Sequence, residues 1–179
     1  CDEQNIVLIF DEIQCGIGRT GTFFGFQQYD LVPDIVITGK GLGGGMPIGA
    51  FISSESYMSM LTNNPKLGHI TTFGGHPVIA AAALATLRTL FDSTLMKQTR
   101  EKEAIIRKLL IHDDIEEIRG KGLMLALIMR NEEITNHLIL TGMDKGILLF
   151  WLLYEPRAVR ITPPLNISNE EIKKGCKII

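Results

Sequence analysis

Residues 35–47 read Ile-Val-Ile-Thr-Gly-Lys-Gly-Leu-Gly-Gly-Gly-Met-Pro, an apolar run that passes directly into a glycine-rich loop. The apolar run predicts a buried strand of a parallel sheet. Glycines beyond it let backbone and ligand approach each other closely. Lys40 opens this loop and is a candidate nucleophile, because its amine attacks carbonyls once burial or a nearby cation disfavours its charged form. The alternative is an ordinary solvated loop lysine.

A second apolar run, residues 6–10 (Ile-Val-Leu-Ile-Phe), predicts another buried strand and ends in Asp11-Glu12. In open α/β sheets, ligands bind beyond the carboxyl ends of the strands, so Asp11 and Lys40 are expected near one crevice. Residues 49–52 predict a further strand. Residues 78–91 predict a helix, because they are rich in alanine and Pro77 precedes them.

The remaining chain predicts a smaller α+β unit in a βαβ-like order. Its helices are expected near 95–110 and 134–145 and its strands near 123–129 and 147–153, with residues 115–119 and 159–164 as further segments of the unit. We therefore predict an α/β protein in which residues 1–91 belong to a large domain and residues 92–179 form an incomplete small domain. Both ends of the chain read as truncated.

Composition excludes several classes of protein. With 45% hydrophobic and 21% charged residues and a net charge of -2, the chain lacks the basic surface that nucleic acid requires. No apolar run approaches the roughly 20 residues of a membrane helix. The three cysteines form no CxxC pair and no two histidines have the spacing of metal ligands, so we expect no metal site. Few and widely spaced cysteines are typical of a protein of the reducing cytoplasm, and we expect that location.

Two motifs resemble those of nucleotide-binding proteins but lack the sequence context that such sites need. Residues 16–21 match G-x-G-x-x-G, but residues 22–26 carry no helical pattern, which an NAD-dependent oxidoreductase needs there. Residues 6–12 resemble the magnesium-binding strand of P-loop NTPases, yet Asp34 and Gly41 stand where that loop needs glycine and Ser or Thr. A hydrolase fits less well, because no G-x-S-x-G motif occurs.

Pyridoxal phosphate chemistry uses all of these parts, since it needs a lysine that forms a Schiff base and an acid on the pyridinium nitrogen. Lys40 would supply the amine, and Asp11 would keep the ring nitrogen protonated through a charge-assisted bond. If the strand continues, Ile13 lies on the same side as Asp11 and could press against the ring. Gln14 could then reach the phenolic oxygen.

The phosphate needs its own donors. Thr71 and Thr72, followed by Gly74-Gly75 and a helix N-terminus, offer hydroxyls, amides and a favourable dipole. Capping of the helix is the alternative role for these threonines.

Three ordered motifs, residues 11–21, 40–50 and 72–77, resemble those of class III pyridoxal phosphate aminotransferases. That family includes acetylornithine, ornithine and 4-aminobutyrate aminotransferases. The resemblance covers essentially the whole chain, which corresponds to the C-terminal half of such enzymes. It implies fold type I, with part of the large mainly parallel-sheet domain and an α+β small domain.

The resemblance also implies the site. Lys40 forms the Schiff base, Asp11 binds the pyridine nitrogen, Ile13 stacks on the ring and Gln14 contacts the ring oxygen. Thr72, together with Thr71, would bind the phosphate of the neighbouring subunit of a homodimer.

Arg160, which precedes a double proline, matches the arginine that meets a substrate carboxylate or pairs with an active-site glutamate. A structural salt bridge is the alternative.

The implied reaction moves a terminal amine of an ornithine, acetylornithine, 4-aminobutyrate or lysine type donor to a 2-oxo acid such as 2-oxoglutarate, with ping-pong kinetics. Cys15, Gly39 and His76 depart from the family pattern, and Glu12 and Arg19 receive no chemical role. The front half of the family is missing, so this stretch alone is expected to be inactive. A noncatalytic fragment or pseudoenzyme acting in subunit association is the competing hypothesis.

Overall fold

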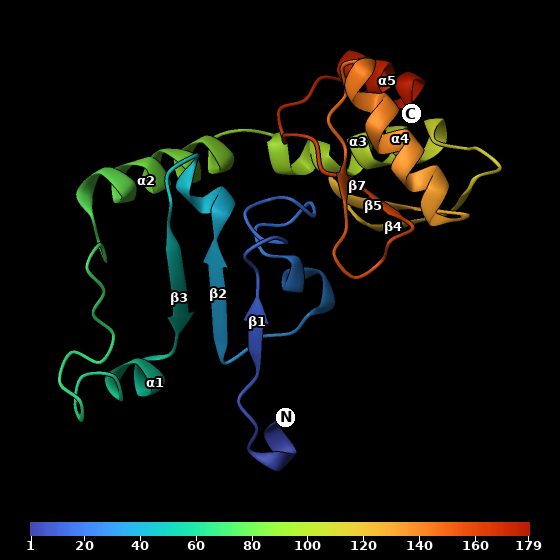
Figure 1. The fold of residues 1–179 in the computed structure, drawn as a ribbon. Helices are drawn as coiled ribbons and strands as arrows, with labels where there is room; N and C mark the ends of the chain where they lie inside the picture. Colours follow the sequence, from blue (N-terminus) through green and yellow to red (C-terminus); the bar gives the residue numbers. More distant parts are fainter. The chain divides into compact units, whose positions relative to one another are not determined.

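The structure is a computed structural model that describes all residues from 1 to 179, and they divide into two compact units (Figure 1). Unit 1 comprises residues 1–17 and 22–93, and unit 2 comprises residues 18–21 and 94–179. Four residues from the early part of the chain therefore pack with the second unit.

Unit 1 is built on a three-stranded sheet in the order β1-β2-β3. Strand β1 (Ile9–Asp11) runs parallel to β2 (Ile35–Gly39), and β3 (Gly49–Ser53) runs antiparallel to β2. The helices of this unit are α1 (Glu55–Ser59) and α2 (Pro77–Phe91), with 3-10 turns η1 (Asp2–Gln4), η2 (Gly25–Tyr29) and η3 (Lys40–Gly43).

Strand β1 is shorter than the sequence predicts. The apolar run suggested a strand over 6–10, but Ile6 and Val7 are 58% and 43% exposed and lie outside it. Only β2 pairs with β1, and the ladder begins at Ile9 opposite Ile35. A strand needs a paired neighbour as well as an apolar sequence, so the run before Ile9 forms no ladder.

Helix α2 packs against the glycine loop that follows β2. Its alanine-rich sequence favours a helix, and Pro77 occupies its first turn after the N-cap residue His76. Gly44 has φ 57°, and a Cβ there would lie 2.3 Å from Thr86 Oγ1 of α2. This close approach requires glycine, and it fixes the loop that Lys40 opens.

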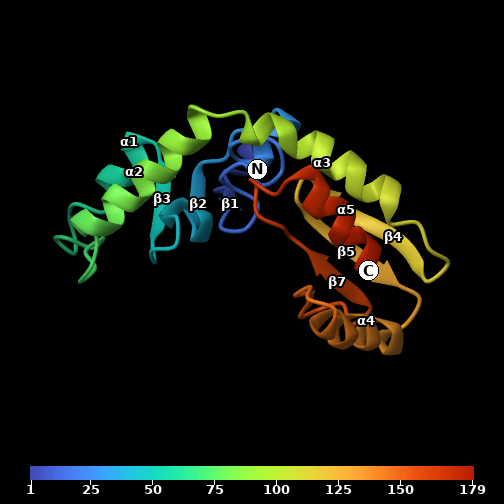
Figure 2. The same cartoon turned by 90° about the horizontal axis from the view of Figure 1, so that it is seen from above.

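Unit 2 contains an antiparallel sheet in the order β4-β5-β7-β6, and Figure 2 shows its strands β4, β5 and β7. Its elements are α3 (Leu95–Leu109), β4 (Ile115–Lys121), β5 (Met124–Met129), α4 (Glu132–Asp144), β6 (Phe150–Trp151), β7 (Ala158–Ile161) and α5 (Asn169–Ile178). Strands β5 and β6 are joined through α4 and separated by β7, which is a split βαβ arrangement. The strand expected over 147–153 shrinks to Phe150–Trp151, because this edge strand pairs only with β7.

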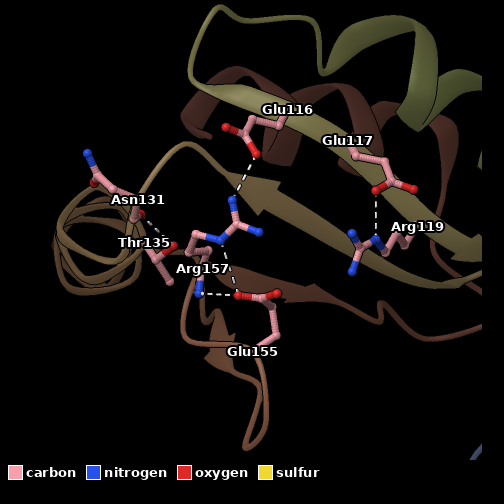
Figure 3. A network of polar contacts seen from close by, with 7 residues as sticks. All are labelled: Glu116, Glu117, Arg119, Asn131, Thr135, Glu155 and Arg157. Atoms are coloured by element: carbon pink, nitrogen blue, oxygen red, sulfur yellow. Dashed lines mark hydrogen bonds and ion pairs between the residues drawn. The ribbon is translucent and has the colours of Figure 1, made fainter.

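A single hydrophobic cluster holds unit 2 together. It gathers buried side chains of β5 and β7 with Ile106 of α3, Ile139 of α4 and Ile172 of α5. Helix α4 is capped by Asn131, whose Oδ1 accepts from Ile134 N at 2.9 Å. Thr135 Oγ1 also donates to the Asn131 carbonyl (Figure 3). No helix of the chain is, by itself, both long enough and apolar enough to span a membrane.

The turn between β4 and β5 provides a test of the packing in unit 2. Gly122 has φ 59°, and a Cβ there would lie 2.6 Å from Arg19 O and 2.7 Å from Thr99 Cγ2. Gly146 has φ 85° but nothing within 4 Å of its Cβ position. Both alanine variants carry a left-handed strain of about 1–2 kcal/mol. Gly122→Ala should lose about 1–3 kcal/mol more than Gly146→Ala in urea unfolding. Equal losses would show that the turn is not tightly packed.

Candidate active site

Asp11 is the last residue of β1, and Lys40 directly follows the neighbouring parallel strand β2. The register pairs Asp11 with Ile37, and Glu12 N extends the ladder by donating to Ile37 O at 2.8 Å. Strand β2 continues to Gly39, and Lys40 begins the next turn. Because both strands run in the same direction, the carboxylate and the amine leave the same edge of the sheet, as the sequence predicts.

Ile13 reaches this edge through a turn, and not by continuing the strand. Asp11 Oδ1 accepts a hydrogen bond from Ile13 N at 3.0 Å, which turns the chain. Ile13 Cγ2 lies 3.8 Å from the Cβ position of Gly39, and Ile48 O lies 2.9 Å from it. The branched side chain is therefore next to the residue that precedes Lys40, and glycine is needed there because a Cβ would meet the Ile48 carbonyl.

The reactive groups at this edge have no charged partners in the structure. The Lys40 side chain is exposed and makes no hydrogen bond or ion pair, and the backbone there has φ 41°. The Asp11 carboxylate accepts only from the Ile13 amide and makes no ion pair, and the exposed Gln14 side chain makes no hydrogen bond. Strained non-glycine residues cluster at functional sites, so the backbone at Lys40 is consistent with a ligand-binding role. The carboxylate, the amide and the amine are free to bind a ligand.

Glu12 is a polar residue whose role the sequence did not reveal. It is only 4% exposed, and its two carboxylate oxygens accept from Gly25 N at 2.9 Å and Phe26 N at 2.8 Å. Phe26 also contacts Phe10 of β1, with ring centroids 5.7 Å apart. Glu12 therefore ties the start of η2 to the end of β1, directly beside Asp11. In the sequence, the only indication of this role is that Glu12 is a second acid, next to Asp11, at the end of an apolar run.

The start of α2 borders a cavity of about 470 Å³. Thr71, Gly74, Gly75 and His76 are among its lining residues, whereas Thr72 is not. His76 Nδ1 accepts from Val78 N at 3.3 Å, so the histidine caps this helix and neither threonine does.

Arg160 lies in β7 of unit 2, between Ala126 and Phe150 of the neighbouring strands, and lines a cavity of about 440 Å³. The Arg160 side chain makes no hydrogen bond or ion pair with another residue of unit 2. Two other arginines of unit 2 do have acidic partners (Figure 3). Arg119 of β4 pairs with Glu117 at 2.6 Å, and Arg157, just before β7, pairs with Glu116 at 2.9 Å and Glu155 at 3.3 Å.

The G-x-G-x-x-G motif serves chain packing in this structure. The next regular element is a 3-10 turn beginning at Gly25, so no α-helix N-terminus follows the glycines. Gly18 and Gly21 have φ 82° and 96°, and Cβ atoms there would lie 2.9 Å from Met96 Cγ and 3.2 Å from Arg100 Cγ. The glycines thus let the chain pass close to α3.

Comparison with known proteins gives a consistent result. The family model described as "Aminotransferase class-III" matches residues 1–179. Acetylornithine aminotransferase of Caldanaerobacter subterraneus subsp. tengcongensis is 36% identical over 184 residues, covering 100% of this chain and 45% of that protein.

Solved structures agree. Ornithine aminotransferase from Toxoplasma gondii ME49 superposes with a TM-score of 0.88 at 32% identity, covering 99% of this chain and 43% of that one. Acetylornithine aminotransferase from Elizabethkingia anophelis gives a TM-score of 0.88 at 33% identity, covering 99% and 45%. The chain thus spans about half the length of the relatives it matches.

Two half-buried cysteines, Cys15 and Cys176, provide a test of the charge at the end of β1. Burial raises the pKa of the Cys15 thiol, and the carboxylates of Glu12 and Asp11 raise it further. Burial also raises the pKa of Cys176, without neighbouring acids. Glu12→Gln removes one negative charge, so it should lower the pKa of Cys15 and speed its alkylation by iodoacetamide near pH 8. Cys176 should alkylate at an unchanged rate, as followed by peptide mass spectrometry. Equal acceleration at both cysteines would indicate general loosening.

Proposed function

The chain belongs to the class III aminotransferases, and from that premise we propose that it is the C-terminal half of an enzyme that transfers an amino group to a 2-oxo acid. The family uses pyridoxal phosphate and has the fold-type I architecture. For the donor we propose a terminal amine of the ornithine, acetylornithine, 4-aminobutyrate or lysine type. Relatives named ornithine and acetylornithine aminotransferase support this class of donor.

The residues at the sheet edge fit this cofactor. A pyridine ring needs an acid at its nitrogen, an apolar contact on its face and an amine for its aldehyde. Asp11, Ile13 and Lys40 offer these groups, and neither the acid nor the amine is neutralised by a protein partner. The shared edge of β1 and β2, which brings Asp11 and Lys40 out together, is the observation that carries the proposal.

Each residue then has a defined task. What pyridoxal phosphate supplies when bound is an electron sink for the carbon that carries the amino group. The Asp11 carboxylate would hold a proton on the ring nitrogen. The Lys40 amine would hold the cofactor covalently and, when free, would move a proton between the two reacting carbons. Ile13 would press on the ring face, and Gln14 would donate to the ring oxygen.

Two further parts of the chain complete the proposal. Thr71 and Thr72 would bind the phosphate of the neighbouring subunit, supported by the cavity beside Thr71 and the amides at the start of α2. This implies a homodimer. Arg160 would bind a substrate carboxylate through its planar fork, supported by the absence of any acidic partner. Three free cysteines support a location in the cytoplasm.

A noncatalytic role in subunit association is the competing proposal, because the chain covers only 45% of the matched acetylornithine aminotransferase. Native mass distinguishes the two, since the chain itself is about 20 kDa. A subunit near 20 kDa supports the noncatalytic role, and one about twice as large supports the enzyme. A panel of ornithine, acetylornithine, 4-aminobutyrate and lysine then identifies the donor.

Lys40→Ala in the full-length protein should remove the covalent link to the cofactor. We expect loss of the visible absorbance band and loss of the cofactor label that borohydride fixes to the protein, because no other amine is assigned to this edge. Lys66→Ala, at an exposed loop lysine of the same unit, should keep both. A borohydride-fixed label retained in Lys40→Ala would reject the assignment of Lys40.

Asp11→Asn should lower kcat by about 100-fold or more, since a neutral amide stabilises a protonated ring nitrogen far less than a carboxylate does. Asp30→Asn, at an exposed acid of unit 1, is the matched control and should leave kcat unchanged. Steady-state kinetics with a saturating donor makes the comparison. Similar rates for Asp11→Asn and the wild type would assign the ring nitrogen to another group.

A further inference from the structure

Arg19 lies in the glycine-rich motif after Asp11 and has no part in the chemistry proposed above. Residues 18–21 nevertheless pack within unit 2. Arg19 O accepts a hydrogen bond from Leu123 N at 2.9 Å, and Gly122 has no room for a Cβ beside this carbonyl. The motif is therefore fastened to the turn that leads into β5.

The Arg19 side chain extends this attachment to a second segment. Its Nη1 donates to Leu123 O at 3.2 Å and to Pro163 O. Burial lowers the pKa of the guanidinium, which nonetheless stays protonated at neutral pH, and no carboxylate faces it. The half-buried guanidinium is thus held by two backbone carbonyls, one from the turn before β5 and one from the segment after β7.

A second cation binds the same segment. Lys102 lies on the buried face of α3 between Thr99 and Ile106 and is only 5% exposed. Its Nζ donates to Leu165 O at 2.6 Å. Arg19 and Lys102 thus hold two carbonyls of one short segment, residues 162–165.

This segment directly follows the strand that carries Arg160. Strand β7 ends at Ile161, where its pairing with Leu125 stops. Pro163 and Pro164 have no N–H, so the backbone beyond β7 can be held chiefly through its carbonyls. Arg19 and Lys102 supply donors for two of these carbonyls, Pro163 O and Leu165 O. These two hydrogen bonds hold the backbone just beyond β7. Arg160 is the second-last residue of that strand, so it lies close in the chain to the held segment.

We propose that Arg19 is a positioning residue for Arg160: by holding Leu123 O and Pro163 O, it fixes the end of β7 from which Arg160 binds a substrate carboxylate. The inference rests on the proposed function, which assigns that carboxylate to Arg160. It also gives the G-x-G-x-x-G motif a role in substrate binding, through a protein contact and without any nucleotide.

The test measures binding of glutarate to the full-length holoenzyme by titration calorimetry. Glutarate has two carboxylates and no amino or oxo group, so its binding does not require amino transfer. Arg160→Ala should weaken binding by about 30-fold, the scale of a charged hydrogen-bond pair, and Arg19→Ala by about tenfold. Arg119→Ala, at an exposed arginine of β4 with its own partner Glu117, should bind as the wild type does.

A double-mutant cycle separates positioning from general damage. If Arg19 acts through Arg160, Arg19→Ala/Arg160→Ala should bind glutarate no more weakly than Arg160→Ala alone. Methylguanidinium should restore binding to Arg19→Ala and have no effect on the double variant. Additive losses, or wild-type binding by Arg19→Ala, would overturn the proposal. Should Arg19→Ala fail to fold, Arg19→Lys in the same cycle carries the test, because it keeps the cation but not the fork.

The failure of this inference can be distinguished from the failure of the proposed function. Amino transfer by the wild type, together with glutarate binding that ignores Arg19, removes the positioning role alone. Coupled losses at Arg19 and Arg160 in a protein that transfers no amino group support the positioning role and remove the proposed activity.

Discussion

The candidate site depends on the parallel pairing of β1 with β2. Asp11 stands opposite Ile37, and both strands end at one edge, so an acid and a lysine that are far apart in sequence leave the sheet together. A slip of one residue would turn Asp11 to the opposite face. The hydrogen bond from Glu12 N to Ile37 O extends the ladder past Asp11 and opposes such a slip. Correct register is therefore the condition for any chemistry between these two residues.

Glu12 and Asp11 are adjacent carboxylates at this edge, but they differ in burial and in hydrogen bonding. Glu12 is buried, and two backbone amides satisfy its oxygens, so its charge is compensated by the protein. Asp11 is exposed and bonds one amide only. A buried carboxylate without such amides would cost several kcal/mol. Glu12 therefore holds the loop, and Asp11 keeps oxygen atoms that can accept from a ligand. Two consecutive acids in a sequence do not show which of them has which role.

Sequence reasoning worked where the decisive interactions are local. Apolar runs predicted β2 and β3, alanine content predicted α2, and an amphipathic pattern rich in Lys, Arg and Glu predicted α3. The chemistry of the loops selected Asp11 and Lys40 as candidates. It was wrong for the start of β1 and the length of β6, because pairing partners decide where a ladder begins and ends. Glu12 and Arg19 received no role for a related reason. Their partners lie in irregular segments, and Arg19 and Pro163 are separated by 144 positions in the chain.

Arginine suits position 19 because its side chain binds two backbone carbonyls from different segments. Lys102 holds one carbonyl, Leu165 O, and a compact ammonium on a flexible stem is sufficient for that. Arg19 must hold Leu123 O and Pro163 O at once, and these belong to the turn before β5 and the segment after β7. A planar guanidinium presents donors in fixed directions, so two acceptors bound to it are also fixed relative to each other. The ends of two neighbouring strands are thereby coupled through one side chain. Arg160, which stands on the second of these strands and has no acid of its own to orient it, depends on that coupling for its place.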